Sequence, residues 1–346
     1  MSKEKVEELS FHFPDSTEFL NPFRPHRYDH FEPTGNIEDF SNMKLPGRRN
    51  RPFIQQVLMY CPRISVVKSF PITEGFVVGS FNSLFIAGPK KTQINVKFPE
   101  QKRCMIESID IHPSEVILAC DGPENNVRIV SLPNGEIKSN LNKHSQNVSS
   151  IMFAPSFNKL ISTSLDGSLI VSDFVKEKCC YKYEKFLNNN PITTSVIRDD
   201  ESLIVIGLSN GNLGIFDERD DIVTQVEAHT DWVNSIDIAS QKYHKSLYFV
   251  SSSLEKDVKI WDLRNLEKPV LSKILDNNVC KVMFSDDDSV FGICSNGTLS
   301  KLCYQESIPS SSFNLQANGV TKADLHSELR RILYSSDESI LSAFYF

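Results

Sequence analysis

Apolar and polar residues alternate in short blocks along most of the chain. Runs of five to eight mostly apolar residues are separated by pairs such as Asp166-Gly167, Asn210-Gly211 and Asn296-Gly297. Such pairs suit the tight turns that join neighbouring antiparallel strands. The pattern therefore predicts β-strands connected by hairpins.

The blocks recur with a period of about 42 residues, the kind of regularity that marks repeat architectures. Residues 147–174 and 319–346 align without a gap, so that Leu160 falls on Ile332 and Asp166 falls on Glu338. Extending this frame gives seven copies, and subtraction puts consecutive turn residues 41 to 45 positions apart. The turn residues are Asn82, Glu124, Asp166, Asn210, Glu255, Asn296 and Glu338.

Three positions around each turn are apolar in every copy. Six residues before the turn stand Phe76, Leu118, Leu160, Ile204, Phe249, Val290 and Ile332, each followed by a second apolar residue. Three residues after the turn stand Phe85, Val127, Leu169, Leu213, Val258, Leu299 and Leu341. The fifth copy predicts four strands, at Val233–Ile238, Leu247–Ser252, Val258–Leu263 and Val270–Leu275. Four strands at this period are typical of a propeller blade.

The letters of two copies resemble the WD-repeat family. Residues 229–264 resemble a complete WD repeat, residues 144–174 resemble a weaker one, and the other five copies share the frame more than the letters. The resemblance covers Pro52 to Phe346 and implies an all-β fold, a seven-bladed WD-type β-propeller.

Counting strands predicts how the ring closes. The seventh copy stops after its third strand at Phe346, and one strand, Phe53–Tyr60, precedes the first copy. We expect this strand to complete the last blade, which removes an unpaired edge. The expected domains are an N-terminal extension, 1–51, partly disordered or partner-bound, and a propeller, 52–346.

The resemblance also implies a buried hydrogen-bond network in the best copies. In the fifth copy it assigns His229, one of Ser251–Ser253 with Ser252 at the centre, Glu255 and Trp261. In the third copy it assigns His144 and Asp166, with Ser172 where tryptophan belongs. The same tryptophan position holds Phe216, Phe344 and, in the first copy, Gly88 or its neighbour. These residues resemble a Ser-His-acid triad, but a structural role is the stronger interpretation.

Composition narrows the function classes. The 346 residues are 40% hydrophobic and 23% charged with net charge −7, which excludes a disordered chain and argues against a bulk nucleic-acid binder. No stretch approaches a membrane span of roughly 18 apolar residues, and the charged N-terminus is unlike a signal peptide. The 8 cysteines are scattered and form no Cys-x-x-Cys motif, which favours a reducing compartment, cytoplasm or nucleus. We expect no catalytic signature, metal, cofactor or small-molecule substrate.

Two surfaces are candidates for protein binding. Trp232, with Asp231 and Asn278 nearby, is expected on the top face, where an exposed tryptophan is a typical interface anchor. Phe249–Arg264 resembles the WDxR box of the substrate receptors of cullin-RING ubiquitin ligases, and that resemblance implies adaptor contacts by Asp262 and Arg264.

A basic cluster precedes the propeller. Lys44, Arg48, Arg49 and Arg51 stand together without an acidic residue, and they could contact RNA phosphates or direct nuclear import. The alternative is a solvated linker.

We therefore expect a non-catalytic interaction scaffold, a subunit of a multiprotein complex. Two alternatives remain: a ubiquitin-ligase substrate receptor, or a component of an RNA-processing or ribosome-assembly particle. The expected partners are proteins, with RNA a weaker candidate, and fold alone does not name them.

Overall fold

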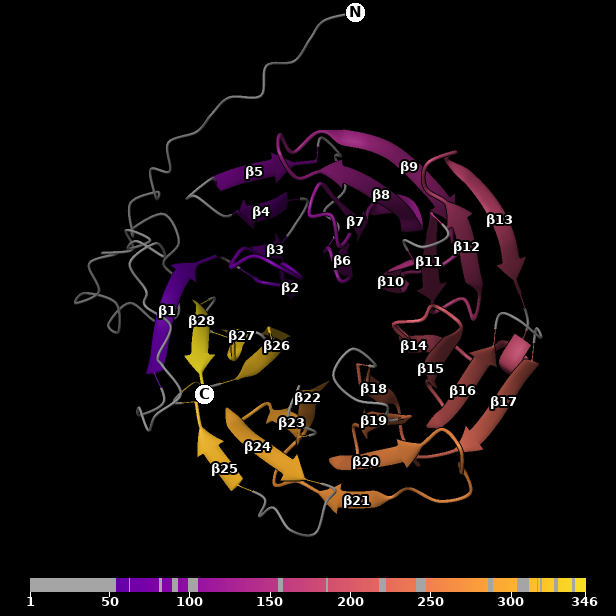
Figure 1. The fold of residues 1–346 in the computed structure, drawn as a ribbon, viewed down its shortest axis with the longest axis vertical. Helices are drawn as coiled ribbons and strands as arrows, with labels where there is room; N and C mark the ends of the chain where they lie inside the picture. Colours follow the sequence, from indigo (N-terminus) through magenta and orange to yellow (C-terminus); the bar gives the residue numbers. More distant parts are fainter. Residues whose placement is uncertain are drawn as a thin grey trace, which may run out of the picture.

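The computed structural model describes residues 54–346, apart from 62, 81–82, 89–92, 99–104, 155–157, 185, 218–221, 241–246, 286–288, 304–310, 316, 318, 327–328 and 338–339. The described residues form seven four-stranded antiparallel sheets placed around a central axis (Figure 1). The seven-bladed propeller expected from the repeat is therefore confirmed. The predicted extension, 1–51, and its basic cluster lie outside the described residues.

The first four blades each take four consecutive strands, ordered from the axis outward. Blade 1 holds β2 (Val66–Ser69), β3 (Phe76–Ser80), β4 (Ser83–Ala87) and β5 (Gln93–Lys97); blade 2 holds β6 (Ile109–Ile111), β7 (Ile117–Asp121), β8 (Asn126–Ser131) and β9 (Ile137–Lys143). Blade 3 holds β10 (Val148–Ala154), β11 (Lys159–Ser164), β12 (Leu169–Asp173) and β13 (Lys178–Tyr183); blade 4 holds β14 (Ile192–Ile197), β15 (Leu203–Leu208), β16 (Asn212–Asp217) and β17 (Ile222–Glu227).

The last three blades follow the same order, with one exception. Blade 5 holds β18 (Val233–Ile238), β19 (Tyr248–Ser253), β20 (Asp257–Asp262) and β21 (Leu271–Ile274); blade 6 holds β22 (Val279–Phe284), β23 (Ser289–Cys294), β24 (Thr298–Cys303) and β25 (Ser311–Asn314). Blade 7 holds β26 (Val320–His326), β27 (Arg331–Ser336) and β28 (Ile340–Tyr345), and its outer strand is β1 (Ile54–Tyr60) from the other end of the sequence. Short 3-10 turns occur at Pro123–Asn125 and Phe186–Asn189.

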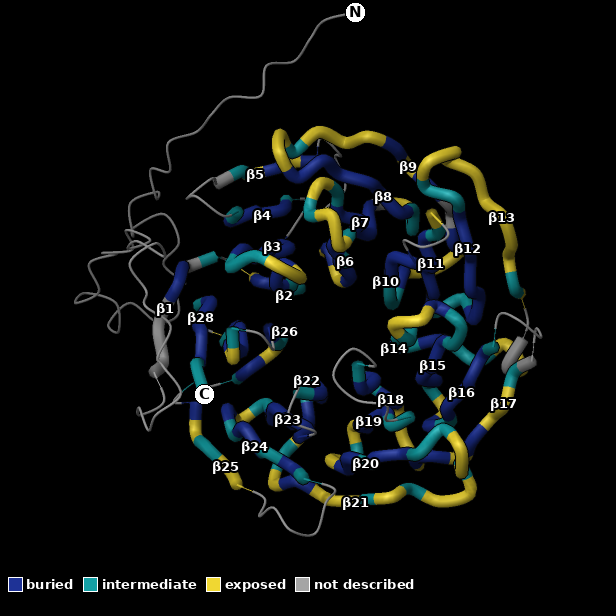
Figure 2. The backbone as a smooth tube through the Cα atoms, viewed as in Figure 1, coloured by how far each residue is buried: buried dark blue, intermediate teal, exposed yellow. Residues whose placement is uncertain are grey.

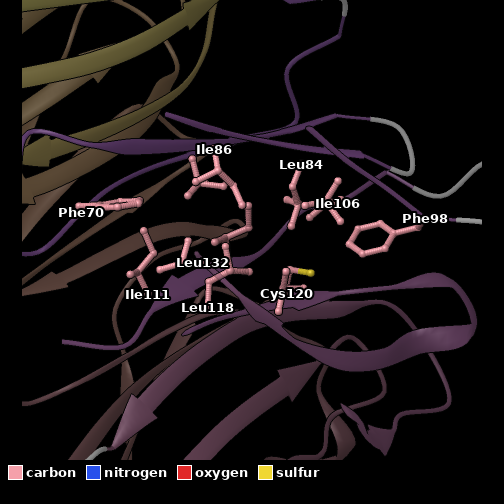
Figure 3. Packing of buried hydrophobic residues seen from close by; sticks show 13 residues of the cluster. Phe70, Leu84, Ile86, Phe98, Ile106, Ile111, Leu118, Cys120 and Leu132 are labelled. Atoms are coloured by element: carbon pink, nitrogen blue, oxygen red, sulfur yellow. The ribbon is translucent and has the colours of Figure 1, made fainter. Parts of the chain in front are cut away.

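The hydrophobic core lies between the blades. Among the described residues, seven clusters of buried apolar residues occur, one at each junction of neighbouring sheets. Leu160 packs toward blade 2 while its neighbour Ile161 packs toward blade 4, because successive side chains of a strand point to opposite faces. This explains the paired apolar positions of the repeat, all of which are buried. Figure 3 shows the junction of blades 1 and 2, where Leu84 and Ile86 face Leu118 and Cys120.

Aspartates link the inner strands of neighbouring blades at three junctions. Asp110 accepts the N–H of Phe153 at 2.8 Å, Asp237 that of Phe284 at 2.7 Å, and Asp324 that of Ser69 at 2.7 Å. All three occupy the same position in their blades. Each pairs with the second of the two consecutive apolar residues of the repeat, on the second strand of its own blade. The Asp324 bond joins blade 7, which contains both β1 and β28, to blade 1.

The ring presents two faces with different backbone segments. We define the top face as the surface made by the segments joining consecutive blades and by the turns between second and third strands. In blade 5 these meet because Val233 pairs with Ser253. The fourth strands form the rim, and β13 and β21 are largely exposed there (Figure 2). Among the described residues no helix has the length and apolarity to cross a membrane.

One sequence assignment moves by a residue. Phe76 pairs with Ala87, whereas the corresponding residues of blades 5 and 7 pair with Trp261 and Phe344. The first-copy equivalent of the tryptophan position is therefore Ala87, the neighbour of Gly88. The turn residues Asn82 and Glu338 lie outside the described residues.

Candidate protein-interaction site

The buried network of blade 5 links the segment before β18 to β19 and β20. Nε2 of His229 lies 2.8 Å from Oγ of Ser251, and Nε1 of Trp261 donates to the same Oγ at 3.0 Å. Nδ1 of His229 lies 3.0 Å from the Glu255 carboxylate, which can only accept, so this nitrogen carries the proton. The Ser251 hydroxyl then donates to Nε2. The chain satisfies every polar atom of this set.

The expected serine, Ser252, is wrong by one position. The Oγ of Ser252 donates instead to Asn234 at 2.8 Å. Ser251 lies on the strand face that carries Phe249 and meets Trp261, and Ser252 lies on the opposite face. The sequence Ser251-Ser252-Ser253 offers a hydroxyl on both faces, so only the register of β19 and β20 decides between them.

Blade 3 has a second version of the network without a tryptophan. Nε2 of His144 lies 2.9 Å from Oγ of Ser162, and its Nδ1 lies 2.8 Å from Oγ of Ser168. The Ser168 hydroxyl donates to Asp166 at 2.5 Å and so connects histidine and carboxylate. Ser172 is buried where blade 5 has its tryptophan. His144 and Asp166 thus occupy the expected places, with Ser168 between them as a member that the sequence did not single out.

Burial and hydrogen bonding fix the charges of both networks. Burial lowers the pKa of His144 and of His229, which outweighs the opposing effect of the carboxylates, so both imidazoles are neutral at pH 7. Burial raises the pKa of Asp166, but hydrogen bonds from Ser168 and Ser145 outweigh it and hold the pKa below its ordinary value. The pKa of Glu255 is lowered in the same way by Thr230 and His229.

The triad-like set of blade 5 is a structural one. Ser251 and Trp261 are fully or almost fully buried, so a substrate has no access to the Ser251 hydroxyl. His229, Glu255 and Asp257 also bring possible metal-ligand atoms within 4.8 Å of one another. These atoms already interact with other protein groups. Nζ of Lys259 lies 3.0 Å from the Asp257 carboxylate, and Nδ1 of His229 lies 3.0 Å from the Glu255 carboxylate.

The top face of blade 5 also carries an exposed tryptophan. Trp232 is 44% exposed and Leu254, across from it on the turn between β19 and β20, is 43% exposed. Three hydrogen bonds fix the backbone here: Leu254 N–H to Trp232 O at 3.1 Å, Trp232 N–H to the Asp231 carboxylate at 2.7 Å, and Ser253 Oγ to Asp231 O at 2.9 Å. The backbone that carries both side chains is therefore held in place before any partner arrives.

Leu254 is the member of this surface that sequence reasoning missed. It directly precedes the turn residue Glu255, where the third and fourth copies have Leu165 and Ser209. A large apolar residue in an otherwise polar turn was the available signal. Asn278 lies on the adjoining connection to blade 6, exposed, with its carbonyl accepting the N–H of Ser295 at 2.8 Å.

Asp262 and Arg264 lie on the opposite, bottom face of blade 5. Asp262 ends β20, and the Arg264 guanidinium forms a bidentate ion pair with its carboxylate, with N–O distances of 2.8 Å and 2.6 Å. The Arg264 side chain is 64% exposed and remains accessible. The structure therefore separates the two predicted protein-binding surfaces by the height of the propeller.

Comparison with known proteins identifies the repeat. The sequence model described as "WD domain, G-beta repeat" matches residues 135–173 and 221–262, which contain the third and fifth copies. Each match begins with the outer strand of one blade, β9 or β17, and continues with three strands of the next.

Two curated relatives align with part of the chain. Pre-mRNA-processing factor 19 homolog 2 from Arabidopsis thaliana is 26% identical over 157 residues, 45% of this chain and 29% of that protein. An uncharacterized WD repeat-containing protein from Schizosaccharomyces pombe is 25% identical over 188 residues, 49% of this chain and 50% of that protein. The alignments thus span half or less of each relative.

The matches fall on the copies that keep the histidine networks, and the remaining blades share the same strand order and junction cores. The chain carries WD repeats in its third and fifth copies and folds as a seven-bladed β-propeller.

Proposed function

We propose that this protein is a non-catalytic interaction scaffold, a subunit of a multiprotein complex that binds partners through the top face of its propeller. The observation that carries the proposal is the exposure of Trp232 on a backbone fixed by three hydrogen bonds. An exposed tryptophan on a rigid support is the typical centre of a protein interface, because binding then costs little conformational entropy.

Affinity purification of the tagged full chain, read by mass spectrometry, tests this role. Trp232→Ala is expected to release partners that the wild type retains, and Glu267→Lys, a charge reversal on the exposed bottom loop of the same blade, is expected to release none of those partners. If the wild type captures no protein at stoichiometric yield from its own cells, the scaffold proposal is wrong.

A second candidate function is that of a substrate receptor in a cullin-RING ubiquitin ligase. It is favoured by the exposed Arg264 at the end of β20, with Asp262 beside it as the WDxR box requires. Arg264→Ala with Trp261 intact is expected to abolish capture of the ligase adaptor. Unchanged capture by this variant, or no capture by the wild type, contradicts the receptor role.

A third candidate, a component of an RNA-processing or ribosome-assembly particle, is supported by the name of the Arabidopsis relative alone. The residues proposed to contact RNA, Lys44, Arg48, Arg49 and Arg51, lie outside the described residues. Nuclease treatment before elution is expected to release the partners of such a particle, and nuclear localisation of a fluorescent fusion is expected with it. Retention of all partners after nuclease treatment argues against this role.

A further inference from the structure

The exposed apolar pair Trp232 and Leu254 stands among acidic side chains. In the described top-face segments around blades 5 and 6, residues 228–232, 254–256, 275–278 and 295–297, the charged side chains are those of Asp231, Glu255, Lys256 and Asp276. Three of the four are carboxylates. The connected backbone makes these neighbours: Leu254 N–H bonds Trp232 O, and Leu275 N–H bonds Lys256 O at 2.9 Å, which places Asp276 next to the turn.

The Glu255 carboxylate of this surface keeps its negative charge. The carboxylate of Glu255 accepts bonds from His229 and from the backbone and hydroxyl of Thr230, and these stabilise its ionised form. Asp231 and Asp276 are exposed to solvent. A phosphate backbone would be repelled here, whereas a cationic side chain beside an apolar one would find a carboxylate and an indole face together.

Resting on the proposed scaffold role, we propose that the top face of blades 5 and 6 binds a segment of a partner protein in which Lys or Arg side chains flank an apolar residue. The apolar residue packs on Trp232 and Leu254, and the cations approach Asp231 and Asp276. Lys256 repels the cationic side chains of the segment and thereby lowers its affinity.

Short synthetic peptides test this on the full chain. One set places Lys or Arg on both sides of Leu or Phe, and a matched set replaces every Lys or Arg by Glu. Binding is followed by the fluorescence of Trp232, the exposed member of the two tryptophans, since Trp261 is buried. We expect the basic set to bind, the acidic set not to bind, and affinity to fall with added salt.

Variants locate the site. Trp232→Ala is expected to weaken binding about 30-fold or more, the loss typical of a hot-spot tryptophan, with binding then followed by a label on the peptide. Asp231→Lys is expected to weaken peptide binding about tenfold, and Lys256→Glu is expected to strengthen it several-fold. Each substitution changes the net charge of the site by two units. Glu267→Lys on the bottom face makes the same charge change and is expected to alter nothing. Thermal unfolding of each variant checks that the fold is intact.

The inference is overturned if no basic peptide binds, if the variants bind as the wild type does, or if the acidic peptides bind equally well. Binding of single-stranded RNA at Trp232, or self-association that Trp232→Ala abolishes, also overturns it, since either names a different occupant. If the double variant Trp232→Ala with Asp231→Lys retains its partners, only the proposed site is contradicted and the scaffold role still holds. If the wild type captures no partners, the scaffold role itself is wrong.

Discussion

At the scale of single residues, buried polar side chains hold each network blade together. In blade 5 the Ser251 hydroxyl serves both His229 and Trp261, which come from the segment before β18 and from β20. Ser168 has the corresponding linking role in blade 3, between His144 and Asp166. Such groups stabilise the fold chiefly because leaving any one of them unpaired in the interior is costly.

Ser251→Ala is expected to lower the free energy of unfolding by about 2–4 kcal/mol. The change leaves both Nε2 of His229 and the indole N–H of Trp261 without the Ser251 hydroxyl as hydrogen-bond partner. Ser252→Ala is the matched control: it removes a buried hydroxyl one position along, whose partner Asn234 is only half-buried, and should cost about 1 kcal/mol. Urea unfolding measures both. Equal losses would show that Ser251 has no special place in the network.

The neutral histidines predict acid sensitivity. Folding lowers the pKa of His144 and His229, so below pH 6.5 these two histidines bind more protons in the unfolded chain than in the folded one, and their contribution to stability falls as pH falls. The slope is at most about 1.4 kcal/mol per pH unit for each histidine. Urea unfolding at a series of pH values between 7.5 and 5 measures it. His144→Gln with His229→Gln is expected to flatten this slope; an unchanged slope contradicts the assignment.

At the scale of elements, the turn of one blade is fixed against the segment leading into the next. His229 N–H bonds Gly211 O at 3.0 Å, and Leu315 N–H bonds Gly297 O at 2.9 Å in the same way. Gly211 has φ +87°, and a Cβ at this position would lie 2.2 Å from His229 O. Only glycine allows both the left-handed backbone and the close approach of the next blade.

Gly211→Ala is therefore expected to destabilise the protein by at least about 1–2 kcal/mol from backbone strain alone, with the contact to His229 O adding to this. Gly292→Ala is the matched control. A Cβ at this position would lie 3.1 Å from the flexible end of the Leu275 side chain, and the backbone of Gly292 is extended within β23. That variant should change stability by less than about 1 kcal/mol. Comparable losses in differential scanning calorimetry would argue against turn strain.

At the scale of the whole molecule, the ring is held by inter-blade contacts that differ in kind. All seven junctions have an apolar core, and three add an aspartate that accepts a backbone N–H from the next blade. The hydrogen bond of Asp324 crosses the junction of blades 7 and 1. Nζ of Lys68 lies 4.0 Å from the Asp324 carboxylate and 3.6 Å from the Asp110 carboxylate. The strand β1 pairs with β28 beside this junction.

Asp324→Ala is expected to cost about 1–3 kcal/mol, because the buried N–H of Ser69 loses its acceptor. The loss should appear as faster hydrogen exchange in β1, β2 and β26, before exchange in blades 3 to 5. Asp324→Asn keeps an oxygen acceptor and should recover part of the stability. Uniformly faster exchange around the ring would show that this junction is not a local weak point.

Much of this architecture follows from the repeat. Leu160 and Ile161 are both apolar because a middle strand is buried on both faces, and that signature in seven copies indicated seven blades packed side by side. The fifth-copy strands were placed to within a few residues, because Asn-Gly-like turns and alternation mark strand ends. The position of Trp232 on the top face followed from the same frame.

The remaining features depend on contacts between distant segments. Strand register decided that Ser251, and not Ser252, meets Trp261, since a shift of one residue reverses the face of every side chain. The sequence by itself determined the number of blades and the buried positions, because these are periodic and local. The tertiary structure alone decided which hydroxyls join the networks, which junctions carry an aspartate, and that Leu254 lies beside Trp232, because each of these depends on how separate strands meet in space.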